Sequence, residues 1–254
     1  MSWVFDWSLL GAPLLAGLVV TATHVLLGRE VLKRGIIFID LTIAQIAALG
    51  VLAESLWHPG SEHSNWHAQL GAVSAALAAA LLLAWTEKRW PELQEALIGS
   101  LYVVAASAAL LLLANHPHGH EQLTQLLAGQ ILWVNYERIW PVAILYAGVL
   151  SVWFLFARRL PLLFYLLFAI TVTASVQLVG VFLVFASLIL PALAVRKFSD
   201  RPALLLGYAL SASAYAFGLW LSVPFDLPSG PLVVIVLALF SGLAAPLLAY
   251  KRMQ

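Results

Sequence analysis

Nearly the whole chain consists of apolar stretches, each long enough to cross a membrane as a helix and separated from the next by a short polar break. A helix needs roughly 20 apolar residues to span the hydrocarbon core, and the bilayer offers no water to hydrogen-bond an irregular backbone. Only 10% of the 254 residues are charged, whereas a soluble domain carries about 25%. The sequence therefore predicts an all-α, polytopic helical bundle in a lipid bilayer, with residues 1–254 forming a single transmembrane domain.

The apolar stretches predict nine helices, of which about eight or nine cross the membrane. Their expected bounds are 8–27, 35–56, 68–86, 94–114, 141–157, 161–178, 181–195, 203–222 and 231–250. The run 160–195 is barely long enough for two crossings, so we place a break at Gly180. Residues 123–134 (LTQLLAGQILWV) are predicted to form a re-entrant or interfacial helix, because a tenth crossing there would move Arg158 and Arg159 to the opposite side.

The basic residues indicate the orientation. All of the 13 Lys and Arg residues except Arg138 lie in breaks that this helix order places on one side of the membrane. Lys and Arg accumulate in cytoplasmic loops. We therefore expect the N-terminus outside the cell and the C-terminus in the cytoplasm.

Polar residues interrupt the second predicted helix at FIDLTIAQIAALG (38–50). A charged residue at the bilayer centre costs roughly 2.5–3.5 kcal/mol, so it usually faces a wet cavity or the bundle interior. Thr42 and Gln45 are three residues apart on one face, and Asp40 is turned about 140° away from Gln45. We assign Asp40, Thr42 and Gln45 to a translocation pathway, together with Gln177 beside the expected break. The alternative for Thr42 and Gln45 is interhelical hydrogen bonding, worth about 0.6–2 kcal/mol.

The histidines are concentrated in the two long outer loops. Six of the 7 histidines lie there: His58, His63, His67, His116, His118 and His120. Neutral imidazole is a good ligand for zinc, copper and nickel, and His-rich tracts are a metal-binding composition. We name these six as metal ligands at the outer surface. The alternative is that short external loops need polar residues and histidine is one of several choices.

Several catalytic and nucleotide-binding motifs are absent from the sequence. It has no GxxxxGK[ST], so the chain does not bind ATP through a P-loop. HExxH and GxSxG are missing as well, and there is no cysteine. We therefore predict a transport protein rather than an enzyme, with no cofactor bound in this chain. The net charge of +1 gives no reason to expect nucleic acid as a partner.

Four motifs, in order along the chain, resemble those of ABC-type zinc and manganese uptake permeases, the ABC-3 family. VLKRGIIFIDLTIAQIAALGVLAE is similar to that family's run of basic residues followed by F-x-G-D-A-L-S-H-A-x-x-P-G. QLLAGQILWV resembles its L-x-G-x-I-L segment, and DLPSGPLVVIV resembles its D-x-P-x-G-P-x-I-V element. The most specific is VQLVGVFLVFASLILPALAVR, which resembles V-G-x-x-L-V-x-A-L-L-I-x-P-A-x-x-A-R.

The resemblance implies the permease subunit of an ATP-driven importer in the cell membrane of a bacterium or archaeon. Such a subunit pairs with a second copy of itself, with two cytoplasmic ATPase subunits that hold ATP and magnesium, and with a periplasmic or surface-anchored substrate-binding protein. The transported substrate implied is a divalent metal ion, zinc first and manganese second. The segment PALAVRKFSDR (191–201) would be the cytoplasmic coupling element that docks on the ATPase, with the residues Pro191, Arg196, Lys197, Asp200 and Arg201.

The second-helix motif departs from the family pattern at two positions. Aligned without gaps on Phe38 and Gly50, the family's Asp falls on Leu41 and its His falls on Gln45. An Asp and a His four residues apart stand on one helical face and make a half-site for a divalent ion, whereas here one amide remains. The alternative substrates are therefore a metal chelate or another small solute, and the alternative mechanism is a secondary transporter that works alone.

Overall fold

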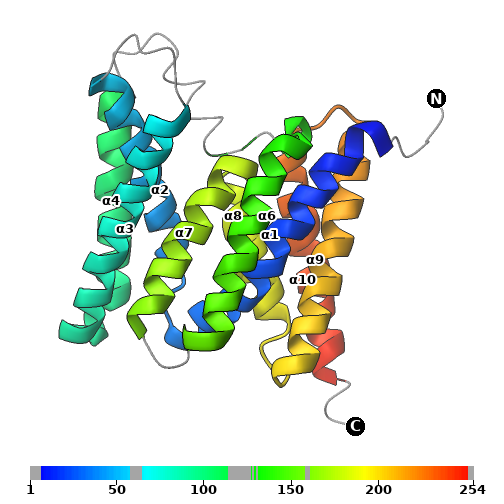
Figure 1. The fold of residues 1–254 in the computed structure, drawn as a ribbon. Helices are drawn as coiled ribbons and strands as arrows, with labels where there is room; N and C mark the ends of the chain where they lie inside the picture. Colours follow the sequence, from blue (N-terminus) through cyan, green and yellow to red (C-terminus); the bar gives the residue numbers. More distant parts are fainter. Residues whose placement is uncertain are drawn as a thin grey trace. The chain divides into compact units, whose positions relative to one another are not determined.

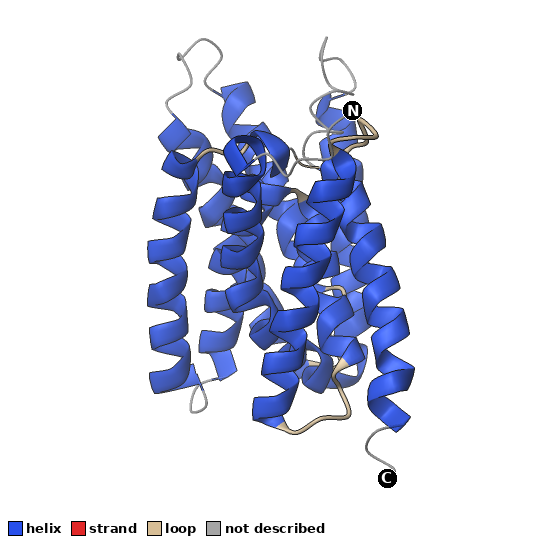
Figure 2. Cartoon of the chain, turned by 90° about the vertical axis from the view of Figure 1, so that its right-hand side faces the viewer, coloured by secondary structure: helices blue, strands red, loops and turns tan. Residues whose placement is uncertain are grey.

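The computed structural model describes residues 7–57, 65–113, 127, 129, 131–157 and 161–250. Within these residues the chain is helical and contains no strand (Figure 2). The all-α class predicted from the apolar stretches is confirmed.

Nine α-helices account for most of the described residues (Figure 1). They are α1 (Trp7–Arg34), α2 (Ile39–Trp57), α3 (Asn65–Arg89), α4 (Gln94–Leu113), α6 (Tyr136–Val152), α7 (Pro161–Val179), α8 (Val181–Ala194), α9 (Asp200–Ser222) and α10 (Ser229–Tyr250). Two 3-10 turns, η1 (Pro91–Leu93) and η2 (Ile131–Trp133), precede α4 and α6, and a π-helical turn, η3 (Trp153–Ala157), follows α6. Each expected helix is present, and Gly180 separates α7 from α8 as predicted.

Two helices continue well beyond the expected C-terminal ends of their apolar stretches. α1 continues to Arg34 and α3 continues to Arg89, so the last turn of each carries basic residues. Positive charge near a helix C-terminus is favourable, and long basic side chains reach the headgroups while their stems stay in the apolar layer. The hydrophobic pattern ends these helices too early because it counts apolar residues alone.

Six helical segments are long and apolar enough to cross a membrane. They are Leu9–Arg34, Trp66–Arg89, Pro91–Leu113, Tyr136–Phe156, Pro161–Val179 and Arg201–Ser222. Two shorter apolar helices, Val181–Ala194 and Ser229–Ala244, add to these. The described residues therefore support a multi-pass membrane protein, while the expected number of eight or nine crossings is not confirmed.

The predicted re-entrant or interfacial helix at 123–134 lies mostly outside the described residues. Its described part consists of Leu127, Gly129, the turn η2 and Val134.

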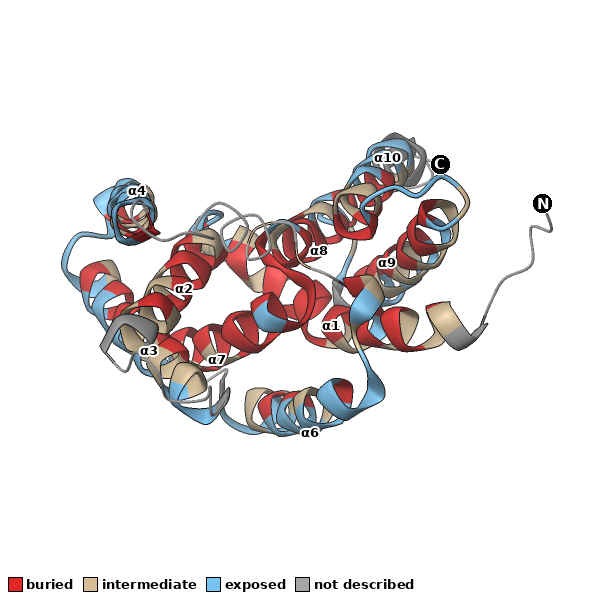
Figure 3. Ribbon diagram, turned by 90° about the horizontal axis from the view of Figure 1, so that it is seen from above, coloured by how far each residue is buried: buried red, intermediate tan, exposed pale blue. Residues whose placement is uncertain are grey.

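Contacts divide the chain into two compact units that alternate along the sequence. Unit 1 comprises Met1–Arg34, Leu127–Ala147 and Gln177–Gln254, and unit 2 comprises Gly35–Leu126 and Gly148–Val176. In unit 1, α1 packs against α8 and α9, and α10 packs against the same two helices. The buried residues gather where these helices face one another (Figure 3). Unit 1 therefore has a core of its own.

Close contacts and buried hydroxyl groups join the helices of unit 1. Gly28 of α1 lies against the backbone carbonyl of Leu188 in α8, and Gly17 of α1 lies against the ring of Tyr215 in α9, so a side chain at either glycine would overlap its neighbour. The hydroxyl oxygens of Tyr215 and Ser187 are 2.7 Å apart and share a hydrogen bond between α9 and α8. Small residues that let helices approach closely are typical of membrane bundles.

Two glycines are required by the backbone at the break between α7 and α8. Gly180 has φ 85° and Gly129 has φ 69°, a region that residues with a side chain rarely occupy. A Cβ atom on Gly129 would overlap the carbonyl group of Val179. The motifs QLLAGQILWV and VQLVGVFLVF, far apart in sequence, therefore meet backbone to backbone.

Unit 2 is built around α2, which packs against α3 on one side and α4 on another. Gly50 of α2 and Gly71 of α3 lie so close that a Cβ on either would meet the other's backbone. The turn between α3 and α4 is closed by Gln94, whose Nε2 donates to the carbonyl of Leu83 at 2.9 Å and whose Oε1 accepts from the Thr86 hydroxyl at 2.9 Å. These contacts fix the three helices that carry the candidate site.

Candidate translocation site on α2

The start of α2 is held by its own turn and by α4. Gly35, with φ 70°, follows the last residue of α1, which is the position where helices commonly end on a glycine. The N–H of Phe38 donates to Oε1 of Glu95 in α4 at 3.3 Å. The free N–H groups of a helix N-terminus favour a nearby carboxylate, so Glu95 ties the beginning of α2 to α4.

Asp40 occupies the first turn of α2 and is 1% exposed. Among the described residues, neither oxygen of its carboxylate has a hydrogen-bond partner. Burial of a charged group without a partner is costly. The backbone N–H groups at the start of α2 are the polar groups nearest to this carboxylate, which is therefore buried with lone pairs open to a ligand.

Thr42 is fully buried and ties α2 to α4. Its hydroxyl donates to the carbonyl of Ile98 in α4 at 3.0 Å, and the carbonyl of Phe38 lies at 3.1 Å. This is the interhelical hydrogen bond that one of the two sequence interpretations predicted for Thr42.

Helical spacing places Gln45 closer than Asp40 to the face of α2 that Thr42 turns toward α4. Gln45 follows Thr42 by three residues, about 60° around the helix, and is 5% exposed. Farther along this side, Leu52 packs with Ala109 and Leu113 of α4. Asp40 precedes Thr42 by two residues, which places it about 160° away, on nearly the opposite face of the helix. Because both residues are within α2, the helical spacing places Asp40 and Gln45 on different faces of this helix.

The remaining predicted site residues are spread over the chain. Gln177 is in the last turn of α7 and is exposed, and His67 is in the first turn of α3 and is exposed. His58, His63, His116, His118 and His120 lie outside the described residues. Within the described ranges, no three His, Cys, Asp or Glu side chains come together as a metal-binding group.

The predicted coupling element (191–201) comprises the end of α8, the connection to α9 and the first two residues of α9. Pro191 is buried within α8, whereas Arg196, Lys197 and Arg201 are exposed. Asp200 is the first residue of α9. Arg196 and Lys197 are therefore on the connection between α8 and α9, and Arg201 is in the first turn of α9.

Two polar residues that the sequence did not single out lie in unit 2. Glu95 holds the start of α2, as described above. Glu54, near the other end of α2, borders a cavity between α2 and α3. The spacing of 14 residues between Asp40 and Glu54 was the available signal, because it returns to nearly the same helix face.

The described residues form several helices apolar enough to cross a membrane, and one helix buries a carboxylate, an arrangement typical of membrane proteins that carry ions or other polar solutes. The chain belongs to the ABC 3 transport family, whose model matches residues 7–165 and 157–245. Membership of this family confirms the resemblance predicted from the four motifs and the transport class predicted from the composition.

Relatives and one solved structure agree with this assignment. The chain is 24% identical over 251 residues to the high-affinity zinc uptake system membrane protein ZnuB of Haemophilus influenzae, covering 90% of this chain and 94% of ZnuB. It is 23% identical over 260 residues to a Chlamydia pneumoniae protein named "Probable metal transport system membrane protein", covering 94% and 88%. The structure of PsaBC from Streptococcus pneumoniae in complex with Fab has the same fold, with a TM-score of 0.72, 21% identity and coverage of 94% of this chain and 91% of that one.

Proposed function

We propose that this chain is the membrane permease subunit of an ATP-driven importer of divalent metal ions, with zinc as the first candidate and manganese as the second. Family membership supports the permease role, and the names of the relatives support a metal as substrate. The observation within the chain that carries the proposal is the buried carboxylate of Asp40, which has no hydrogen-bond partner among the described residues.

Asp40 replaces part of the ligand set that the family motif would supply. Leu41 offers no ligand atom and Gln45 offers an amide, so Asp40 is the one anionic group in the FIDLTIAQIAALG segment. Carboxylate oxygens bind zinc as well as harder cations such as manganese. A divalent ion passing Asp40 would neutralise the carboxylate, and a single anionic ligand would hold the ion weakly enough to release it.

The proposed complex contains a second copy of the chain, two cytoplasmic ATPase subunits and an external substrate-binding protein. ATP and magnesium would bind to the ATPase subunits, which the absence of a P-loop motif from this sequence supports. The exposed residues Arg196, Lys197 and Arg201 would dock on the ATPase. ATP binding to the ATPase subunits would then change the side of the membrane to which the pathway between the two copies opens.

Uptake by the assembled complex tests this proposal. We expect radioactive zinc or manganese to accumulate in proteoliposomes that contain the chain, its ATPase and its binding protein, and only with ATP. Accumulation without the ATPase would contradict the proposal and favour a secondary transporter. Accumulation of a preformed chelate but of neither free ion would favour the chelate alternative, which the replacement of the Asp–His pair by Leu41 and Gln45 supports.

A further inference from the structure

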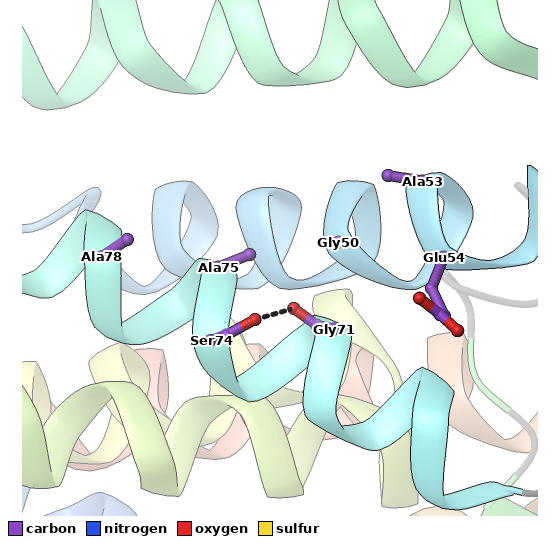
Figure 4. Close-up of a pocket in the computed structure, with 7 residues that line it drawn as sticks. All are labelled: Gly50, Ala53, Glu54, Gly71, Ser74, Ala75 and Ala78. Atoms are coloured by element: carbon purple, nitrogen blue, oxygen red, sulfur yellow. Dashed lines mark hydrogen bonds between the residues drawn. The ribbon is translucent and has the colours of Figure 1, made fainter. Parts of the chain in front are cut away.

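An open cavity of about 400 Å³ lies between α2 and α3 in unit 2 (Figure 4). Its lining residues are Gly50, Ala53, Glu54, Gly71, Ser74, Ala75 and Ala78. Glu54 is the one carboxylate among them, and the others are glycine, alanine or serine. The cavity is therefore a groove with small walls and a single anionic group.

The groove is fixed by the close contact of its two helices. Gly50 and Gly71 approach backbone to backbone, and the Cβ of Glu54 lies 3.3 Å from the point where a Cβ on Gly71 would be. Glu54 is thus placed directly over Gly71. The small side chains that line the rest of the groove leave its space open. Ser74 donates its hydroxyl hydrogen to the carbonyl of Gly71 at 3.1 Å, which leaves the lone pairs of the serine oxygen available to a cation.

Helical spacing places an imidazole about one turn beyond the groove, on α3. His67 precedes Gly71 by four residues in α3, so it lies on the same face about 6 Å farther along the helix axis, toward the start of α3. His67 is exposed, as is its neighbour Trp66, which begins the membrane-crossing segment of α3. Trp residues gather at membrane interfaces. This end of the groove therefore opens at a membrane surface, which the predicted orientation makes the outer one.

Asp40 and Glu54 lie on one face of α2. The residues between them at helical spacing are Ala44, Ala47 and Val51, so the face has a carboxylate at each end and apolar side chains between. The two carboxylates are about 40° apart around the helix and about 21 Å apart along it. If α2 crosses the membrane as its sequence predicts, it has one anionic group near each surface.

We propose that Glu54 and His67 form an outer binding station for a divalent cation at the mouth of this groove, upstream of Asp40 on the same helix. A carboxylate together with an imidazole is a donor set for zinc or manganese. The station would concentrate the ion at the outer surface before the ion reaches Asp40. This inference rests on the proposed import of a divalent metal and adds the residues that receive it.

Concentration-dependent uptake separates the two stations. We expect Glu54→Gln to raise the zinc or manganese concentration for half-maximal uptake at least about tenfold, because loss of a group that only orients a metal ligand already costs roughly 10–100-fold in affinity. The maximal rate should stay close to that of the unchanged chain. Asp40→Asn should instead lower the maximal rate. Glu92→Gln, an exposed glutamate in η1, is the matched control and should alter neither quantity.

Each outcome has a distinct meaning. An unchanged half-maximal concentration in both Glu54→Gln and His67→Ala would overturn the outer station while leaving the proposed import intact. Absence of zinc and manganese uptake by the unchanged complex would overturn the proposed import itself. If Glu54 and His67 bind one ion, the variant that carries both substitutions should have the same half-maximal concentration as the more strongly affected single variant.

Access to the groove gives a second test that does not depend on transport. The chain has no cysteine, so Glu54→Cys introduces the single thiol of the protein. We expect a membrane-impermeant maleimide added outside the cell to label this thiol, and zinc to slow the labelling of Ser74→Cys, which keeps Glu54 and His67. Lack of labelling at position 54 would show that lipid or a second copy covers the groove and would overturn the station.

Discussion

At the scale of single residues, Asp40 and Thr42 are two positions apart in α2 and have different surroundings. Thr42 has two carbonyl partners, whereas the carboxylate oxygens of Asp40 have none in the described part of the chain. The hydrogen bonds of Thr42 are those of a residue that stabilises the packing of α2. The burial of Asp40 is costly without a ligand, so the two residues should respond differently to substitution.

Asp40→Asn tests the role of the carboxylate. The asparagine side chain has nearly the same size but no charge, so it removes an uncompensated buried anion and should not lower the thermal unfolding temperature of the chain in detergent. Metal uptake by the assembled complex should nevertheless fall at least about tenfold, a loss comparable to that of a metal ligand group. A variant that transports normally would remove Asp40 from the pathway.

Thr42→Val tests the hydrogen bond to α4. Valine keeps the shape and loses the hydroxyl, so the free energy of unfolding should fall by about 0.6–2 kcal/mol, the range for interhelical hydrogen bonds in membranes. Thr42→Ser retains the hydroxyl and serves as the control. Unfolding in mixed detergent, followed by circular dichroism, measures both variants, and equal stability of the valine and serine variants would contradict the assignment.

At the scale of helices, Gly129→Ala tests the contact between the GQILW segment and the α7–α8 break. The alanine would have to adopt φ near 69°, which costs of the order of 1–3 kcal/mol, and its Cβ would overlap Val179. We expect a marked loss of stability in thermal unfolding. Gly99→Ala in α4, where a Cβ meets open space, should be neutral or slightly stabilising, and similar losses in both variants would contradict this account.

The helices could be predicted from the sequence because lipid imposes one strong rule, that a crossing is apolar and helical. Gly180 could be recognised as a break because its run is too long for one helix and too short for two ordinary ones. Glu54 was not recognised, because its significance depends on the approach of Gly50 to Gly71 from another helix. A hydropathy pattern contains the period of one helix and carries no information about which face meets which neighbour.

The two proposed metal-binding residues of α2, Asp40 and Glu54, also show how much helical spacing alone predicts. Helical periodicity places Asp40 away from Gln45 and close to the face of Glu54, and the observed packing of Thr42 on α4 agrees with it. Periodicity does not reveal that Asp40 is 1% exposed. The burial of a charged side chain depends on contacts between segments far apart in sequence, so it had to be observed.

At the scale of the whole molecule, the proposed division of labour places ATP hydrolysis in one chain and translocation in another. The connection between α8 and α9, with the first turn of α9, is suited to join them because Arg196, Lys197 and Arg201 are all exposed there. Reversal of these charges in the triple variant R196E/K197E/R201E should leave the helices folded, since none of the three side chains is buried. ATP hydrolysis by the partner should no longer respond to the permease, and metal uptake should be lost.

A second basic group at the end of α3 provides the control for this variant. Lys88 and Arg89 are also exposed, and the predicted orientation places them on the same side of the membrane. The variant K88E/R89E changes charge there without touching the α8–α9 connection, so it should keep most of the coupled hydrolysis. Comparable losses in both variants would mean that general surface charge rather than one docking element holds the ATPase. Loss in the triple variant alone, with both proteins folded by circular dichroism, would assign the contact to the α8–α9 connection.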